Sequence, residues 1–598
     1  MPRPNISITE LPNSITTDID LATPNGMVKL FRQTDAQIFN GWDIYDGLCD
    51  IEIIKKIKIA VDAAAEILTF KGKKKIIVAG AGTSGRLAMF ISRNFNRLCR
   101  QKKIKFEYMI AGGDLALIKA QEGAEDDPIT AQKELEKIVG DAEKILYIGV
   151  TCGLSAPYIA GQLDYTSDNS NKFFSILLGF NPLELARKIS IENWDKRFYD
   201  VVEKIKKHPK CVILNPVVGP EPITGSTRMK GGSATKIILD VLFTASLIKA
   251  DLLSPNDLNE FLRPYSSNME DLIFNMIRQY ENAWINTYSQ LENIARLIDL
   301  GGSALNSHKH IYYIGSDVYG ILGTIDASEC PPTFGDSFDD IRGYLPNGWN
   351  DLFEAKRDLS NVGKEYHISL DYFKQEILPN LSPMDLVIFL GKEKDIELHE
   401  TLFEKIKGKD TQLGAVLINP ACSSFPGFDA VVSLKIEPLG LINNTEILAE
   451  FAMKLVLNDI TTGAHILSGK IYHNRMIDLN ISNTKLYYRT IGIIQEIVNV
   501  DMDTAVESIL KSIYETDTLT YEQSGASISK HINACKMRKK IVPCALLIAT
   551  GNFNFIEVHN AIEKEPKVRA IIEKIAKENN SKPDSKSKTL KKPKEKKR

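Results

Sequence analysis

The chain has 598 residues, of which 43% are hydrophobic and 25% are charged, and its formal net charge is −2. This composition is typical of a soluble globular protein with more than one core, and it excludes a disordered chain. The small net charge predicts neither nucleic acid nor an anionic membrane as a partner. We see no apolar run of about 18 residues and no apolar signal core near Met1, so we expect a cytoplasmic protein.

The eight cysteines form no CxxC pair and no Cys/His cluster with zinc spacing, which fits a reduced compartment. His308 and His310 flank the start of a predicted strand. A structural role for this pair is favoured over a metal site. We therefore expect no metal and no cofactor.

Residues 1–50 are polar with short apolar patches and are assigned to an N-terminal extension. A helical pattern follows over 51–70. From there to residue 280, apolar runs that are typical of buried parallel strands alternate with helical patterns. The predicted strands are residues 74–80, 106–113, 144–150, 173–180 and 211–216. This alternation predicts a doubly wound α/β domain over 51–280.

The pattern recurs over residues 281–485, with predicted strands at 310–316, 386–391, 414–420 and 431–436. The apolar helix predicted at 234–253 is echoed at 452–471. An internal duplication with an offset of about 220–235 residues explains both matches. We expect these two helices to pack across a pseudo-twofold axis; the alternative is that each covers only its own sheet.

Residues 486–580 contain amphipathic helix patterns and no strand series, so we predict an all-helical lid. Residues 581–598 contain eight lysines and are expected to form a disordered basic tail. Its simplest interpretation is a solubilising tail. The functional alternatives are a nuclear localisation signal or a contact with a polyanion.

The most informative motif, AGAGTSGRLA, stands at 79–88, where a strand should end and a helix begin. Gly82 lets the backbone approach a ligand, and Thr83 and Ser84 add hydroxyl groups beside the N–H groups of a helix start. The GxGxxG spacing also fits a dinucleotide site, but no ribose-binding acid follows. The hydroxyl groups favour a sugar phosphate.

Two further small-residue loops, at 151–157 and 219–236, follow later strands of the same lobe. Parallel strands bring such loops to one sheet edge, which predicts a phosphate pocket there. Taken singly, each loop could be a turn and a helix cap. Acidic candidates are Glu125, in a cluster that usually marks a solvated helix start, and Glu329, in a turn-rich run at 325–336.

Together these motifs resemble the sugar isomerase (SIS) domains of the N-acetylmuramic acid 6-phosphate etherase group. The duplicated length, GLSAPYIAGQLD, FGDSFDDIRGYLP and ISNTKLYYR resemble the glucokinase regulatory protein family. The resemblance implies an α/β fold of two tandem doubly wound SIS lobes in a pseudo-dimer, with a C-terminal all-helical lid. GTSGR stands only in the first lobe and DASECPPT only in the second, which implies one composite ligand site.

The resemblance also implies a function. It points to a regulator that binds fructose 6-phosphate or fructose 1-phosphate and inhibits a glucokinase or hexokinase-type enzyme, in the cytoplasm and with a further pool in the nucleus. The implied ligand residues are Gly82, Thr83, Ser84, Glu125, Thr151, Gly153, Ser155, Glu329 and Lys485. The alternative is an etherase-like lyase in which Glu125 and Glu329 share the roles of acid and base.

Overall fold

The computed structural model of the chain describes residues 7–102, 104–121, 123–352, 357–398, 400–422, 425–478, 481, 484–535 and 538–581. The chain divides into two compact units, Met1–Met476 and Ile477–Arg598. The predicted tail at 581–598 lies outside the described residues, apart from the helical residue Ser581.

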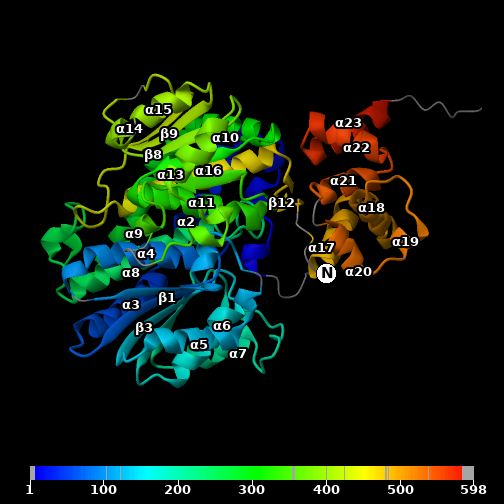
Figure 1. Cartoon of the computed structure of the whole chain (residues 1–598). Helices are drawn as coiled ribbons and strands as arrows, with labels where there is room; N and C mark the ends of the chain where they lie inside the picture. Colours follow the sequence, from blue (N-terminus) through cyan, green and yellow to red (C-terminus); the bar gives the residue numbers. More distant parts are fainter. Residues whose placement is uncertain are drawn as a thin grey trace, which may run out of the picture. The chain divides into compact units, whose positions relative to one another are not determined.

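The first unit begins with an α/β lobe built on a five-stranded parallel sheet, in the order β2-β1-β3-β4-β5. Its helices cover both faces of the sheet, α3, α4 and α8 on one and α5, α6 and α7 on the other (Figure 1). The strands are β1 (Lys74–Gly80), β2 (Phe106–Ile110), β3 (Lys144–Val150), β4 (Phe173–Leu178) and β5 (Cys211–Leu214). The helices are α3 (Ile51–Thr69), α4 (Thr83–Leu98), α5 (Pro128–Val139), α6 (Pro157–Asp168), α7 (Phe198–Lys206) and α8 (Lys230–Lys249).

The second lobe repeats this topology, because its sheet has the order β10-β9-β8-β6-β7 and all of its neighbouring strands are parallel. The strands are β6 (Ile311–Gly315), β7 (Ile341–Tyr344), β8 (Leu386–Gly391), β9 (Gln412–Ile418) and β10 (Ala430–Leu434). The main helices are α10 (Leu291–Asn306), α11 (Asp317–Phe334), α13 (Leu370–Tyr372), α14 (Glu393–Leu398), α15 (Glu400–Lys407) and α16 (Ile447–Leu467). Each lobe has its first strand in second place, as a duplication requires, and the predicted fold class is confirmed.

The N-terminal residues belong to the core of this unit. Helix α1 (Pro24–Asp35) buries Met27, Val28 and Phe31 against it, and α2 (Gln37–Asn40) follows. Helix α9 (Met269–Tyr288) runs through the predicted domain boundary between residues 280 and 281. The sequence pattern therefore divides α9 between the two lobes, and it leaves α1 outside the core that this helix joins.

The lobes are joined through α8 and α16, which confirms the predicted packing of these two helices. The ammonium group of Lys236 on α8 donates to Asp240 and, across the junction, to Glu450 on α16, both at 2.8 Å. All three side chains are at most 4% exposed. Among the described residues, α8 alone is long and apolar enough to span a membrane by composition, but it is wholly buried in the molecule.

The second unit is all-helical over its described residues, in agreement with the predicted lid. Its longest buried face is on α21, where Val542, Ala545 and Leu546 pack against α17 and α18. The helices are α17 (Thr484–Val498), α18 (Met502–Tyr514), α19 (Tyr521–Ser524), α20 (Ile528–Cys535), α21 (Ile541–Ala549), α22 (Phe555–Lys564) and α23 (Val568–Ser581).

Candidate ligand site

The glycine-rich loop after β1 turns directly into α4. Gly82 caps this helix with φ of 52°, a left-handed conformation that favours glycine. Gly80 and Gly85 have a packing role instead. A Cβ atom on Gly80 would lie 2.5 Å from the carbonyl carbon of Ser84, and one on Gly85 would lie 2.5 Å from Ile110. The glycines therefore bring the start of α4 close against the sheet.

A pocket of about 370 Å³ opens at this helix start, and both lobes line it. The first lobe supplies Gly82, Thr83 and Arg86, and the second supplies Glu329 and Thr333 from α11. Further residues that line the pocket are Gln121, Glu125, Ser226, Thr227, Arg228 and Pro332. The site is composite, as the split of GTSGR and DASECPPT between the lobes predicts, and we call it the composite pocket.

Helix α11 corrects one expectation. Residues 325–334 were expected to form a turn-rich run, but they are helical, and α11 ends at Phe334 with Gly335 in the left-handed conformation at its C-terminus. Pro331 and Pro332 lie inside the last turn of this helix, where neither can donate the usual backbone hydrogen bond to the carbonyl four residues earlier. Glu329 is thereby held on a helix and is 3% exposed.

Four buried side-chain atoms around this pocket have no hydrogen-bond partner among the described residues. They are Nη2 of Arg86, Oγ of Ser226, Nε of Arg228 and Oε1 of Glu329. Buried polar groups in folded proteins are almost always paired with protein or water. Unpaired donors and acceptors in several residues that line one cavity are therefore what a polar ligand site presents.

Burial and neighbouring charges shift the pKa values of the ionisable groups at the pocket. Burial raises the pKa of Glu329, although Arg228, Arg86 and Lys454 and a hydrogen bond from Thr83 oppose this rise. Burial also lowers the pKa of Arg86, and the Glu329 carboxylate counteracts it. Lys454 has a pKa lowered by burial, with Glu329 again the main opposing charge. The Glu329 carboxylate thus lies among the charges of Arg228, Arg86 and Lys454, away from bulk water.

Arg228 ties this pocket to the lobe junction. Its guanidinium donates to Asp326 on α11 at 3.0 Å, and to Thr461 and Thr462 on α16 at 2.8 Å each. The ammonium of Lys454 in turn donates to the Arg228 carbonyl at 2.8 Å. The pocket wall is therefore part of the network that holds the two lobes together.

Of the predicted ligand residues, Gly82, Thr83, Glu125 and Glu329 line the composite pocket. Glu125 is exposed on the 3-10 turn Ala124–Asp126. Lys485 lies in the first turn of α17 in the other unit, and its side chain is outside the described residues.

Ser84, Thr151, Gly153 and Ser155 do not line this pocket. The Thr151 hydroxyl instead accepts the backbone N–H groups of Ser155 and Ala156, at 3.3 and 3.4 Å, just before α6 begins. The loop is adjacent to α4, since Ser84 Oγ lies 3.9 Å from Cys152 Sγ. Ligand contact by these four residues stays a prediction.

Sequence reasoning missed the basic residues of the site. Arg86 belongs to GTSGR and Arg228 to GSTRMK, so both were inside motifs that had been singled out for their hydroxyl groups. A charged residue within a run of small residues beside a predicted ligand loop was the available signal. Lys454 gave no such signal, because it lies in the middle of an apolar helix.

Comparison with known proteins decides the family. Models of the glucokinase regulatory protein N-terminal SIS domain, second SIS domain and C-terminal lid domain match residues 56–167, 288–468 and 473–572. The human glucokinase regulatory protein is 32% identical over 94% of this chain and 91% of its own length. The Xenopus laevis protein is 32% identical over 95% and 93%. The chain belongs to the glucokinase regulatory protein family.

A second group of relatives, the N-acetylmuramic acid 6-phosphate etherases, matches a shorter part of this chain. The N-acetylmuramic acid 6-phosphate etherase of Vibrio campbellii is 31% identical over 40% of this chain and 68% of its own length. The human and Xenopus laevis regulatory proteins, in contrast, match over both lobes and the helical unit.

Proposed function

We propose that this chain is a sugar-phosphate-binding regulator that inhibits a glucokinase or another hexokinase-type enzyme. The observation that carries the proposal is the composite pocket with its four unpaired buried polar atoms, in a chain that belongs to the glucokinase regulatory protein family. Its working place is the cytoplasm, and the basic residues 581–598 direct a part of the protein to the nucleus.

In this proposal the ligand is fructose 6-phosphate or fructose 1-phosphate. Thr83 and the start of α4 receive the phosphate, with Arg86 as a charged donor beside them. Ser84, Thr151 and Ser155 are the further hydroxyl donors. Glu125 and Glu329 accept hydrogen bonds from sugar hydroxyl groups, and Lys485 stays a predicted ligand residue.

Regulation follows from the composite nature of the pocket. A ligand shifts binding of a partner only if it favours one arrangement of the protein over another. Because the pocket wall includes Arg228, which bonds to α11 and α16, a bound sugar phosphate acts on the lobe junction. The partner enzyme would bind the arrangement with the sugar phosphate and the arrangement without it with different affinities.

Calorimetry with both fructose phosphates tests ligand binding, and Thr333→Trp is the informative variant. Thr333 is half-buried at the pocket wall, so the indole fills the space of the ligand, and binding is expected to fall at least tenfold. Ile189→Trp, at a position 66% exposed, is the matched control and keeps parental affinity. Equal affinity of Thr333→Trp and the parent would contradict the assignment of this pocket.

The regulatory part is tested with the host's glucose-phosphorylating enzyme. We expect the full chain to inhibit it and the inhibition to change when fructose 6-phosphate or fructose 1-phosphate is added. Thr333→Trp should abolish the response to the sugar phosphate. An unchanged kinase rate under all of these conditions would refute the regulator.

The etherase alternative is favoured by one observation, namely that Glu125 and Glu329 both line the composite pocket. Two carboxyl groups in different environments, one exposed and one buried with a raised pKa, can divide the roles of base and acid. Incubation with N-acetylmuramic acid 6-phosphate and detection of lactate separates the two functions. We expect no release; release that Glu125→Gln and Glu329→Gln both abolish would establish the lyase.

A further inference from the structure

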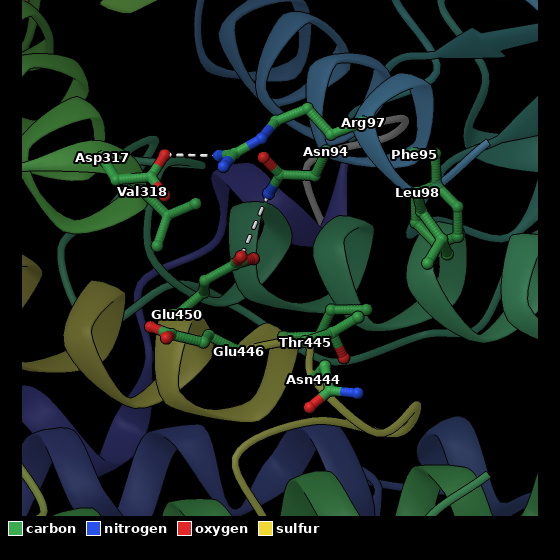
Figure 2. A pocket seen from close by; sticks show the side chains of 11 residues that line it. Asn94, Phe95, Arg97, Leu98, Asp317, Val318, Asn444, Thr445, Glu446 and Glu450 are labelled. Carbon is green, nitrogen blue, oxygen red and sulfur yellow. Dashed lines mark hydrogen bonds and ion pairs between the residues drawn. The ribbon is translucent and has the colours of Figure 1, made fainter. Parts of the chain in front are cut away.

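A second cavity of about 510 Å³ lies between the same two lobes, at the far end of α4 (Figure 2). Helix α4 contributes Asn94 and Arg97, and the start of α11 contributes Asp317. Thr445 and Glu446 come from the chain that enters α16. We call this cavity the twin pocket.

The twin pocket is the pseudo-symmetric counterpart of the composite pocket. Asn94 lies fourteen residues past the end of β1, and Glu329 lies fourteen residues past the end of β6. Asp317 likewise stands two residues past β6, as Gly82 stands two residues past β1. The equivalent helices therefore present equivalent positions to the two cavities.

Helices α8 and α16 also present equivalent positions to the two cavities. Lys236 bonds to Asp240 one turn later, and Lys454 bonds to Asn458 one turn later. Eight residues before these lysines stand Arg228 and Glu446, which line the composite and the twin pocket respectively. The duplication thus made two sites, of which the second kept its cavity while its side chains changed.

In the twin pocket a charged side chain stands where the composite pocket has the glycine at its helix start. Asp317 has φ of 46°, close to the 52° of Gly82, but it carries a carboxylate at the start of α11. Arg97 and Arg93 bind this carboxylate at 2.5 and 3.1 Å (Figure 2 shows the bond from Arg97). Burial would raise the pKa of Asp317, but these ion pairs outweigh it and lower the pKa, so the anion is permanent at neutral pH.

Two of the three cations at the composite pocket, Arg86 and Arg228, have no counterpart here. Ile321 stands in the position of Arg86, and Glu446 in that of Arg228. The remaining lining charges already have partners, since Glu446 binds Lys392 and Glu450 binds Lys236 and accepts the amide of Asn94. The pocket therefore offers no unpaired cation among its lining residues to a phosphate.

What remains suits the hydroxyl groups of a sugar. Asn444 adds an exposed amide to the cavity. Asn94 donates to Glu450 and the Thr445 hydroxyl donates to the Ile442 carbonyl, so each keeps only part of its hydrogen-bonding capacity for a ligand, and the carboxylates keep acceptor positions that ion pairs leave open. Val318 and Ile447 add apolar wall. We propose that the twin pocket is a second binding site, with Asp317 in the phosphate position, for an uncharged sugar or polyol. The phosphate position is taken from the proposed function of the composite pocket, whereas binding of an uncharged sugar in the twin pocket is measured separately.

The test is a titration of the full chain with D-glucose, D-fructose and sorbitol, followed by ligand-observed NMR. Leu98 in the twin pocket and Thr333 in the composite pocket are equivalent positions, which gives a matched pair of blocking variants. We expect Leu98→Trp to weaken binding of an uncharged sugar at least tenfold and Thr333→Trp to leave it unchanged. Asn94→Leu, which removes a polar group without filling the cavity, should weaken it as well.

The opposite result overturns the proposal. Absence of binding of all three compounds, or binding that Thr333→Trp removes and Leu98→Trp spares, shows that the twin pocket is not a sugar site. Unchanged far-ultraviolet circular dichroism of each variant excludes a folding defect.

Asp317→Gly tests the phosphate position itself. Glycine accepts the φ of this residue, and the change leaves Arg93 and Arg97 without their carboxylate at a helix start. We expect the variant to bind one equivalent of inorganic phosphate more than the parent, whatever number the parent binds. No added equivalent would show that Asp317 does not occupy a phosphate position.

Discussion

Replacement of Arg228 by methionine is expected to lower the free energy of unfolding of the two-lobe unit by about 3–5 kcal/mol. The side chain of Arg228 is 2% exposed and that of its partner Asp326 is 4% exposed. Methionine keeps most of the volume but leaves the Asp326 carboxylate buried without its cation. The penalty is that of an uncompensated charge at the lobe junction.

Tryptophan fluorescence during denaturation by urea measures this effect, because all four tryptophans lie in the two-lobe unit. Removing the stranded charge as well, in Arg228→Met with Asp326→Asn, should recover part of the loss. Arg296→Met is the control, since Arg296 forms a surface pair with Asp299 in which both side chains are 52% exposed. Such pairs contribute little, about 0–1 kcal/mol. A loss for Arg228→Met no larger than the control would contradict the role of the network.

The fold was largely predictable because buried parallel strands are near-continuous apolar runs, and these alternate regularly with helices. The strand that the sequence pattern missed, β7, shows the limit of that signal. It has four residues, and Arg342 and Gly343 interrupt its apolar character. Residue 343 must be a glycine because α11 packs closely against it: a Cβ atom there would lie 2.6 Å from the Thr324 Cα. Tertiary packing, rather than strand preference, explains that glycine.

The site was predictable in its loops and not in its charges. A glycine-rich loop after a strand indicates where the backbone can hold an anion, so Gly82 and Thr83 could be placed from local pattern. Arg86 and Glu329 come from different lobes, and their charges lie close together only because α4 and α11 pack against each other. Nothing in the sequence spacing shows which polar atoms the fold buries without partners.

The same reasoning gives the largest expected effect on ligand binding, in Arg86→Met. Arg86 is 1% exposed, and its Nε donates to the Leu117 carbonyl at 2.9 Å, which fixes the guanidinium against the pocket. Its Nη2 has no partner within the described residues and belongs to the pocket wall. A charge-assisted hydrogen bond to a phosphate oxygen is worth about 1.5–3 kcal/mol.

We therefore expect Arg86→Met to weaken binding of fructose 6-phosphate about 10–100-fold, since each 1.4 kcal/mol corresponds to about a factor of ten. Arg86→Lys keeps the charge but loses the bond to Leu117 and the planar fork, so its affinity should fall between those of the parent and Arg86→Met. Arg296→Met again serves as the control, on a surface away from the pocket. Calorimetry at equal ionic strength measures all three variants, because salt weakens the contribution of charge. If Arg86→Met bound the sugar phosphate as tightly as the parent, the unpaired Nη2 atom would be a feature of packing, and the composite pocket would have to hold its ligand through hydroxyl and backbone groups alone.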